Sequence, residues 1–237
     1  MFTRTIKPNQ PRIRAAIIDL DGTMLDTVPD FHLAINRMRA DLDLQPIDQQ
    51  DVALMIGKGS ENLIRSVLGR DFGVAGVEAR FETAMAHYQR HYLEINGDHA
   101  ELYPDVIAGL EAFKAQGLRL ACVTNKPIAF ATPLLARKGL SGYFEVVYGG
   151  DSLPRKKPDP MPLLQVCNDF SLAPAQVVAI GDSSNDAEAA RAAGCAMLTL
   201  PYGYNHGRPV HEIDSDGIVS TLLEAASLIS THNLNVD

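Results

Sequence analysis

Short apolar runs alternate with amphipathic stretches through most of this chain. Five runs have the length and the β-branched content of strands, over residues 15–18, 118–123, 144–148, 177–180 and 195–200. Helical periodicity appears between them over residues 106–116, 129–138 and 186–193, and a glycine follows each of these stretches, as a left-handed C-cap requires. This alternation predicts an α/β fold with a parallel sheet that helices cover on both faces.

The interval from about Pro29 to Gly97 breaks the alternation. It holds no convincing strand and is too long for a single crossover, and its apolar residues recur with helical spacing. The phased positions are Phe31, Ile35, Met38 and Leu42, then Leu63, Ile64, Val67 and Leu68, then Phe81, Met85, Tyr88 and Tyr92. We therefore expect a helical domain of residues 29–97, inserted after the first strand into a core of residues 1–28 and 98–237.

Polar motifs follow four of the predicted strands. They are Asp19-Leu20-Asp21-Gly22-Thr23, Thr124-Asn125-Lys126, Lys156-Lys157-Pro158 and Gly181-Asp182-Ser183-Ser184-Asn185-Asp186. Because ligands of open parallel sheets bind at the carboxyl ends of the strands, we expect the four motifs to converge on one crevice.

Four carboxylates close together in that crevice would either raise one another's pKa or need a cation between them. Asp19, Asp21, Asp182 and Asp186 would repel one another, and a hard divalent ion is the natural counter-charge. Mg²⁺ prefers oxygen ligands and takes one or two carboxylates together with a substrate phosphate, and Asp19 and Asp182 suit the direct contacts. For Asp186 two interpretations stay open: it holds the waters of the metal, or it is an acidic residue of the first turn of a helix.

The remaining polar residues suit a phosphate group. Thr124 offers a hydroxyl, Asn125 an amide, and Lys157 a positive charge, which are the parts that phosphoryl transfer needs. Asp19 would attack the phosphorus to form an aspartyl-phosphate, and Asp21 would protonate the leaving oxygen and then deprotonate water. Since one lysine beside the phosphate suffices, we assign Lys126 to motif geometry or to a surface contact.

These motifs, in this order from Asp19 to Asp186, resemble the haloacid dehalogenase superfamily of phosphotransferases. The resemblance implies a Rossmann-like three-layer core, with a small all-α cap inserted after the first motif. It also implies Asp19 as nucleophile, Asp21 as acid/base and Lys157 as the lysine of the third motif. Mg²⁺ would be held by Asp19, the backbone carbonyl of Asp21, and Asp182. The acid at Asp21 points to hydrolysis of phosphomonoesters.

Within that superfamily the chain is most similar to the phosphoglycolate phosphatases. The shared segments include Ile56-Gly57-Lys58-Gly59 in the cap and Tyr202-Gly203-Tyr204-Asn205 near the end. The resemblance implies hydrolysis of 2-phosphoglycolate, with Asn125, Gly57, Lys58 and Gly22 as substrate-binding residues. Lys58, between two glycines, can approach a small carboxylate closely, or it is an exposed loop lysine. Alternatives are a phosphatase for a sugar phosphate, amino-sugar phosphate, nucleotide or pyrophosphate, and a phosphomutase.

The amino-acid composition limits the kinds of partner and the location that we expect for this protein. The net charge of −8 and a pI near 5.3 argue against binding to a nucleic acid backbone, which needs clustered cations. Cys122, Cys167 and Cys195 show no C-x-x-C spacing and are expected to be buried thiols. The first fourteen residues contain no apolar stretch and predict a solvated tail, and no segment suggests a membrane span. We expect a cytoplasmic monomer or homodimer acting on a small phosphorylated metabolite.

Overall fold

A six-stranded parallel sheet forms the centre of the molecule. The computed structural model describes Ile6 and residues 10–236, and within them the strand order is β5-β4-β1-β6-β7-β8. The strands are β1 (Ala15–Ile18), β4 (Arg119–Val123), β5 (Val146–Tyr148), β6 (Val177–Gly181), β7 (Ala196–Thr199) and β8 (Gly217–Ile218). The five predicted strands are thus confirmed, and β1 lies between β4 and β6 because its four residues are buried on both faces.

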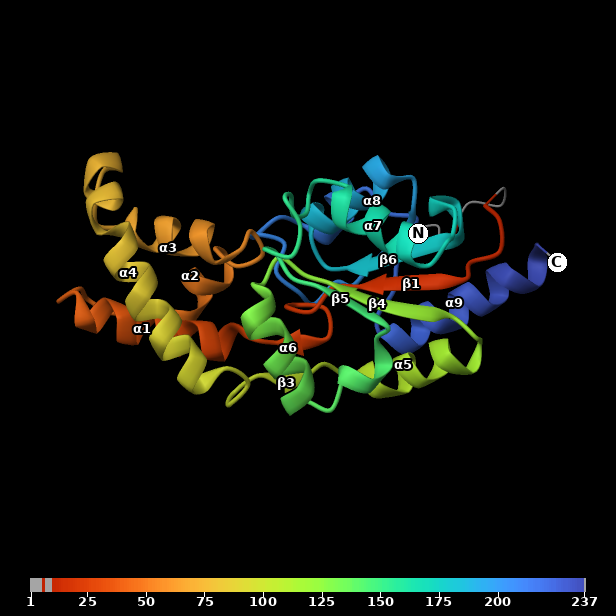
Figure 1. Ribbon diagram of the computed structural model, residues 1–237, viewed down its shortest axis with the longest axis horizontal. Helices are drawn as coiled ribbons and strands as arrows, with labels where there is room; N and C mark the ends of the chain where they lie inside the picture. The colour runs from red at the N-terminus through yellow and green to blue at the C-terminus, as the bar shows by residue number, and fades with distance from the viewer. Residues whose placement is uncertain (1–5, 7–9, 237) are drawn as a thin grey trace.

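Helices cover both faces of the sheet (Figure 1). On one face pack α5 (Val106–Ala115), α6 (Ile128–Arg137) and α9 (Leu222–Asn235), and on the other α7 (Met161–Asp169) and α8 (Ser184–Ala193). Short 3-10 turns lie at Ser141–Tyr143, Pro174–Gln176 and Val210–Glu212. This is the three-layer α/β fold that the sequence predicts, and Gly117, Gly139 and Gly194 have the positive φ expected after their helices.

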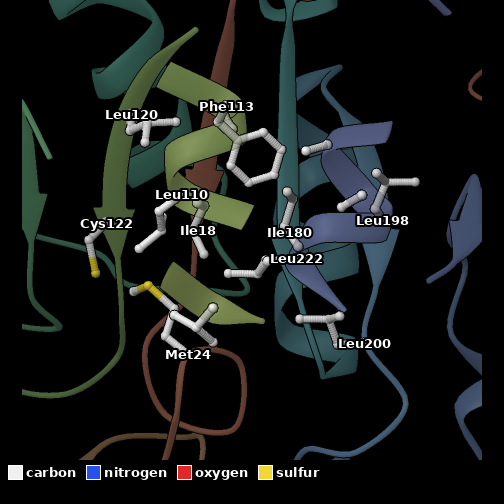
Figure 2. Close-up of a cluster of buried hydrophobic side chains, with 14 of the residues drawn as sticks. Ile18, Met24, Leu110, Phe113, Leu120, Cys122, Ile180, Leu198, Leu200 and Leu222 are labelled. Atoms are coloured by element: carbon white, nitrogen blue, oxygen red, sulfur yellow. The ribbon is translucent and has the colours of Figure 1, made fainter. Parts of the chain in front are cut away.

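The larger core lies between the sheet and the first group of helices. Figure 2 shows it, with side chains from α5 and α9 facing those of the strands. Phe113 and Leu110 are fully buried there, and so is Leu222. Each such side chain contributes about 1.5–3 kcal/mol through removal from water, so this packing holds the strand ends at one edge.

Four helices form a separate unit beside the carboxyl edge of the sheet (Figure 1). They are α1 (Val28–Asp41), α2 (Gln49–Ala53), α3 (Ser60–Leu68) and α4 (Val74–Ile95), and their predicted apolar positions pack into a core of their own. Two short antiparallel strands, β2 (Leu25–Asp26) and β3 (Glu101–Leu102), pair where the chain leaves the sheet and returns to it. We call this unit the cap. The division into domains at 28/29 and 97/98 stays a prediction.

The N-terminal segment differs from its prediction. Ile6 and Ile13 are buried, and the backbone N–H of Ile13 donates to Asn233 Oδ1 in α9 at 2.7 Å. The prediction of a solvated tail is therefore wrong for Ile6 and Ile13, while Pro11, Arg12 and Arg14 are exposed as expected. The rest of the segment lies outside the described residues. Cys122, Cys167 and Cys195 are buried free thiols, as expected. None of the described helices has the length and apolar character that a membrane crossing requires.

Candidate active site

The predicted motifs meet at the carboxyl edge of the sheet. Asp19 follows β1, Thr124 follows β4, and Asp182 follows β6. One cavity between this edge and the cap is lined by Asp19, Asp21, Thr124, Asn125, Lys157 and Asp186 from the core, with cap residues opposite. Its volume is about 30 Å³, which holds about two water molecules.

Lys157 is the electrostatic centre of the cavity floor. Its Nζ lies 2.9 Å from Asp19 Oδ1, 2.6 Å from Asp186 Oδ1 and 2.7 Å from the carbonyl oxygen of Val123. Burial alone would lower the pKa of Lys157, but Asp186 and Asp19 outweigh it and raise the pKa above its ordinary value. The ammonium is therefore charged; it donates hydrogen bonds to Asp186 and Val123 and forms an ion pair with Asp19.

Asp19, Asp182 and Asp186 form the one carboxylate cluster in the described part of the chain with metal-ligand spacing. One oxygen of each lies within 4.8 Å of the others. Burial raises the pKa of Asp19 to about 7 against the opposing effect of Lys157, while burial and then Asp186 raise that of Asp182 well above its ordinary value. Three carboxylates against one ammonium leave two negative charges when all are ionised, so this oxygen donor set fits a divalent cation.

Asp182 is held from several sides. Thr23 donates its hydroxyl to Asp182 Oδ1 at 2.7 Å, and the backbone N–H of Tyr204 donates to Oδ2. Gly22 lies directly behind it with φ +83°, and a Cβ at this position would stand 2.5 Å from Asp182 Oδ2. Gly22, predicted to bind substrate, therefore lies against the carboxylate cluster, where only glycine fits.

Asp21 contacts a second buried lysine. Its Oδ1 accepts hydrogen bonds from Thr27 Oγ1 at 2.8 Å and from Lys126 Nζ at 3.0 Å. Lys126 Nζ also donates to the hydroxyl of Tyr92, in α4 of the cap, at 2.6 Å. Burial lowers the pKa of Lys126, and Asp21 opposes this effect. The expectation of a surface contact for Lys126 was wrong, because α4 covers this side chain.

Asn125 joins the core to the cap. Its Nδ2 donates to the carbonyl oxygens of Gly57 at 2.9 Å and Lys157 at 2.8 Å, and Asn185 Nδ2 donates to the same Gly57 oxygen at 3.2 Å. The side-chain hydrogens of Asn125 are therefore occupied. Its backbone N–H, which has no acceptor in the described part of the chain, is the donor left for a phosphate.

The sequence left two interpretations open for each of Lys58 and Asp186, and the structure bears on both residues. Lys58 is exposed and is not among the residues that line the cavity; with His206 and Arg208 it borders an adjoining depression of about 410 Å³, which shares Lys157 and Asn185 with the cavity. Its predicted contact with substrate stays a prediction. Asp186 lies in the first turn of α8, where it accepts from the N–H and hydroxyl of Ser183, and it also belongs to the carboxylate cluster. The helix role is therefore confirmed, and the role beside the metal stays a prediction.

Sequence reasoning missed several residues of this site. Thr23 and Thr27 stand close to the first motif, and their contacts with Asp182 and Asp21 arise from the tight turn after β1. Nothing in the sequence indicated separately that Tyr92 belongs to the site, because packing between helices explains an aromatic residue at this position of α4 equally well. Lys126 was adjacent to the recognised Thr124 and Asn125, and that adjacency was the available signal.

Comparisons with known proteins agree with this geometry. The model of the family "Hydrolase: haloacid dehalogenase-like hydrolase" matches residues 13–194. The phosphoglycolate phosphatase of Thiobacillus denitrificans is 46% identical over 218 residues, covering 92% of this chain and 96% of that protein. That of Nitrosospira multiformis is 47% identical over 217 residues, covering 92% and 96%.

A solved structure extends the likeness to the whole fold. The crystal structure of a predicted phosphoglycolate phosphatase from Haemophilus somnus 129pt is 34% identical to this chain, with a TM-score of 0.86. The match covers 91% of this chain and 97% of that one. The motifs, the sheet order and these likenesses agree, and the chain belongs to the haloacid dehalogenase-like hydrolases.

Proposed function

We propose that this protein is a Mg²⁺-dependent phosphomonoester hydrolase that converts 2-phosphoglycolate to glycolate and phosphate. The observation that carries the proposal is that Asp19 and Asp21 line one cavity while making different contacts: Asp19 pairs with Lys157, and Asp21 with Lys126. Two carboxylates in distinct environments suit two roles. The relatives named phosphoglycolate phosphatase support the choice of substrate.

In the first step a carboxylate oxygen of Asp19 attacks phosphorus, and the ester P–O bond breaks as the aspartyl-phosphate forms. Asp21 delivers a proton to the leaving glycolate oxygen. The Thr124 hydroxyl, the backbone N–H of Asn125 and the Lys157 ammonium surround the phosphoryl oxygens and orient them for in-line attack. These are roles for side chains that line the cavity.

In the second step water attacks the phosphorus of the aspartyl-phosphate. Asp21, now ionised, takes the proton from this water, and phosphate leaves as the Asp19 carboxylate is restored. Thr27 and Lys126 hold the Asp21 carboxylate at Oδ1, which keeps it directed at the leaving-group side in both steps.

The divalent cation would be held by Asp19, Asp182 and Asp186 together with the backbone carbonyl of Asp21. Their spacing and net negative charge suit it. When bound, Mg²⁺ neutralises charge on the nucleophile and on the phosphoryl oxygens, so that two anions can approach each other.

The cap wall favours a small substrate. Phe31, Ile56 and Leu63 supply apolar surface opposite Asp19, and Ser60 is the hydroxyl residue among the cap residues that line the cavity. A sugar needs several polar partners when buried, so this wall gives no support to a sugar phosphatase or a phosphomutase. Because the cavity volume is about 30 Å³, we propose that residues 29–97 move as a domain to admit the substrate.

The test is a panel of phosphomonoesters assayed with Mg²⁺ and with EDTA. We expect hydrolysis with 2-phosphoglycolate preferred, and loss of activity in EDTA and in Asp19→Asn. The matched control is Asp214→Asn, which changes an exposed carboxylate paired with Arg191 and should keep full activity. Turnover by Asp19→Asn would exclude this nucleophile, while preference for another phosphate would overturn the substrate and keep the mechanism.

A further inference from the structure

We infer that Lys126 binds the carboxylate of the substrate and thereby selects phosphomonoesters that carry an acidic group beside the ester. This inference rests on the proposed function and gives it a specificity-determining residue. It assigns substrate choice to a buried lysine of the core, in place of the cap-loop residue Lys58 that the sequence suggests.

Lys126 lies where the core, the cap and the cavity meet. Its side chain is 1% exposed, and its Nζ lies 4.3 Å from the centre of the Phe31 ring and 4.7 Å from that of Tyr92. Lys126 also lines the cavity beside Asp21. An ammonium in such surroundings interacts strongly with an anion, because aromatic rings and protein replace the water that would screen it.

The number of carboxylates beside each ammonium distinguishes the two lysines of the cavity. Lys157 donates to Asp186 Oδ1 and to the carbonyl oxygen of Val123, and its Nζ forms an ion pair with Asp19 Oδ1 at 2.9 Å. Lys126 donates to the two carboxylate oxygens of Asp21, at 3.0 and 3.4 Å, and to the hydroxyl of Tyr92. Lys157 thus lies beside two carboxylates and Lys126 beside one, so Lys126 is the ammonium better placed to bind a further anion.

The position of the Lys126 ammonium matches the chemistry of the substrate. In the proposed mechanism Asp21 faces the ester oxygen, and Lys126 Nζ is 3.0 Å from Asp21 Oδ1. In 2-phosphoglycolate the carbon that bears the ester oxygen also bears the carboxylate. A carboxylate so close to the leaving oxygen comes within reach of the ammonium beside Asp21.

The other cationic residues in and near the cavity suit this role less well. Two of the residues that line the cavity are cationic, Lys126 and Lys157. Lys157 already forms ion pairs with the carboxylates of Asp19 and Asp186. Lys58 is exposed and borders the adjoining depression, and it is not among the residues that line the cavity. An exposed ammonium gives little binding energy because water screens it.

The experiment compares kcat/KM for 2-phosphoglycolate with kcat/KM for ethyl phosphate, which lacks the carboxylate, in saturating Mg²⁺. We expect Lys126→Gln to reduce the preference for 2-phosphoglycolate by about tenfold to hundredfold, the range of a hydrogen bond to a charged group. Lys126→Arg should keep most of the preference. The matched control is Lys114→Gln, an exposed lysine of α5 over the ring of Tyr143, which should leave the preference unchanged.

The ratio separates substrate recognition from a structural role. If Lys126 serves only to position Asp21, Lys126→Gln slows both substrates equally and the inference is overturned. Loss of the preference in Lys58→Gln, with its retention in Lys126→Gln, also overturns it. A wild-type protein that acts on ethyl phosphate but does not prefer 2-phosphoglycolate refutes the proposed substrate itself, which is a different failure.

A second variant keeps the test valid if Lys126→Gln does not fold. Tyr92→Phe removes the hydroxyl that accepts from Lys126 and keeps the ring. We expect it to weaken inhibition by glycolate several-fold and to leave inhibition by inorganic phosphate unchanged. An equal change in both inhibition constants, or no change in either, contradicts the inference.

Discussion

Replacing Lys157 with methionine would remove the ammonium around which the cavity floor is built. Methionine has a similar unbranched stem, so the change is chiefly one of charge. Asp19 and Asp186 would remain buried at one edge of the sheet, and no other described lysine or arginine forms an ion pair with either. The variant therefore tests whether one cation balances this cluster.

The magnitude follows from the contacts. Removing one partner of a buried ion pair costs about 3–5 kcal/mol, because the remaining charge loses its compensation. Lys157 serves two carboxylates, at 2.9 and 2.6 Å, so we expect a loss in the upper part of this range when both are ionised. Burial raises the pKa of Asp19 to about 7, and protonation of Asp19 relieves part of the loss, so the loss should be larger at about pH 8 than at about pH 5.

Urea unfolding in EDTA measures this loss. With a slope of about 3 kcal/mol/M, a loss of about 3–5 kcal/mol lowers the midpoint by about 1–1.7 M. Mg²⁺ at about 100 times its dissociation constant should restore about 2.7 kcal/mol if the carboxylates still bind it. Lys114→Met, at an exposed position, should stay within about 0.5 kcal/mol of the wild type. A Lys157→Met protein as stable as the wild type in EDTA near pH 8 would refute the reasoning.

Two further predictions concern the same cluster. Burial raises the pKa of Asp19 to about 7 from 3.8, so the metal-free wild type should lose stability as the pH rises through 7, and Mg²⁺ should abolish that loss. Urea unfolding with and without Mg²⁺ checks this, and a flat metal-free profile would contradict it. Gly22→Ala adds a Cβ that would stand 2.5 Å from Asp182 Oδ2 at φ +83°, so it should raise the Mg²⁺ concentration for half-maximal activity at least about tenfold. Gly203→Ala is the comparison that should do the same, since its Cβ would meet the same carboxylate at 2.2 Å.

Much of the fold could be predicted because the side chains that become buried form recognisable apolar patterns along the sequence. β1 and β6 lie in the middle of the sheet, so both of their faces are apolar and their runs are easy to recognise. The helices of the cap were visible because one face of each packs on the others. By contrast β2, β3 and β8 have two residues each, which is too short for a recognisable pattern. Their pairing depends on tertiary contacts and not on the local sequence.

The candidate site was predictable where topology alone determines it. Parallel strands bring residues that follow them to one edge, so the meeting of Asp19, Asp182 and Lys157 could be foreseen. The contacts that cross to the cap could not. The amide of Asn125 donates to a carbonyl oxygen 68 residues away, and Lys126 is buried against Phe31 of α1 and Tyr92 of α4. Such pairings depend on how two units dock, which no local pattern in the sequence records.

The proposed mechanism requires Asp19 to form a covalent phosphoryl intermediate. The most direct measurement is a single-turnover reaction with 2-phosphoglycolate carrying a radiolabelled phosphoryl group, stopped with acid within milliseconds and followed by mapping of the labelled peptide. We predict a label that is stable in acid, released by hydroxylamine as an acyl phosphate is, and located on Asp19 in the peptide that follows β1. Turnover without protein-bound label at any time point, or a label that hydroxylamine does not release, would contradict the account.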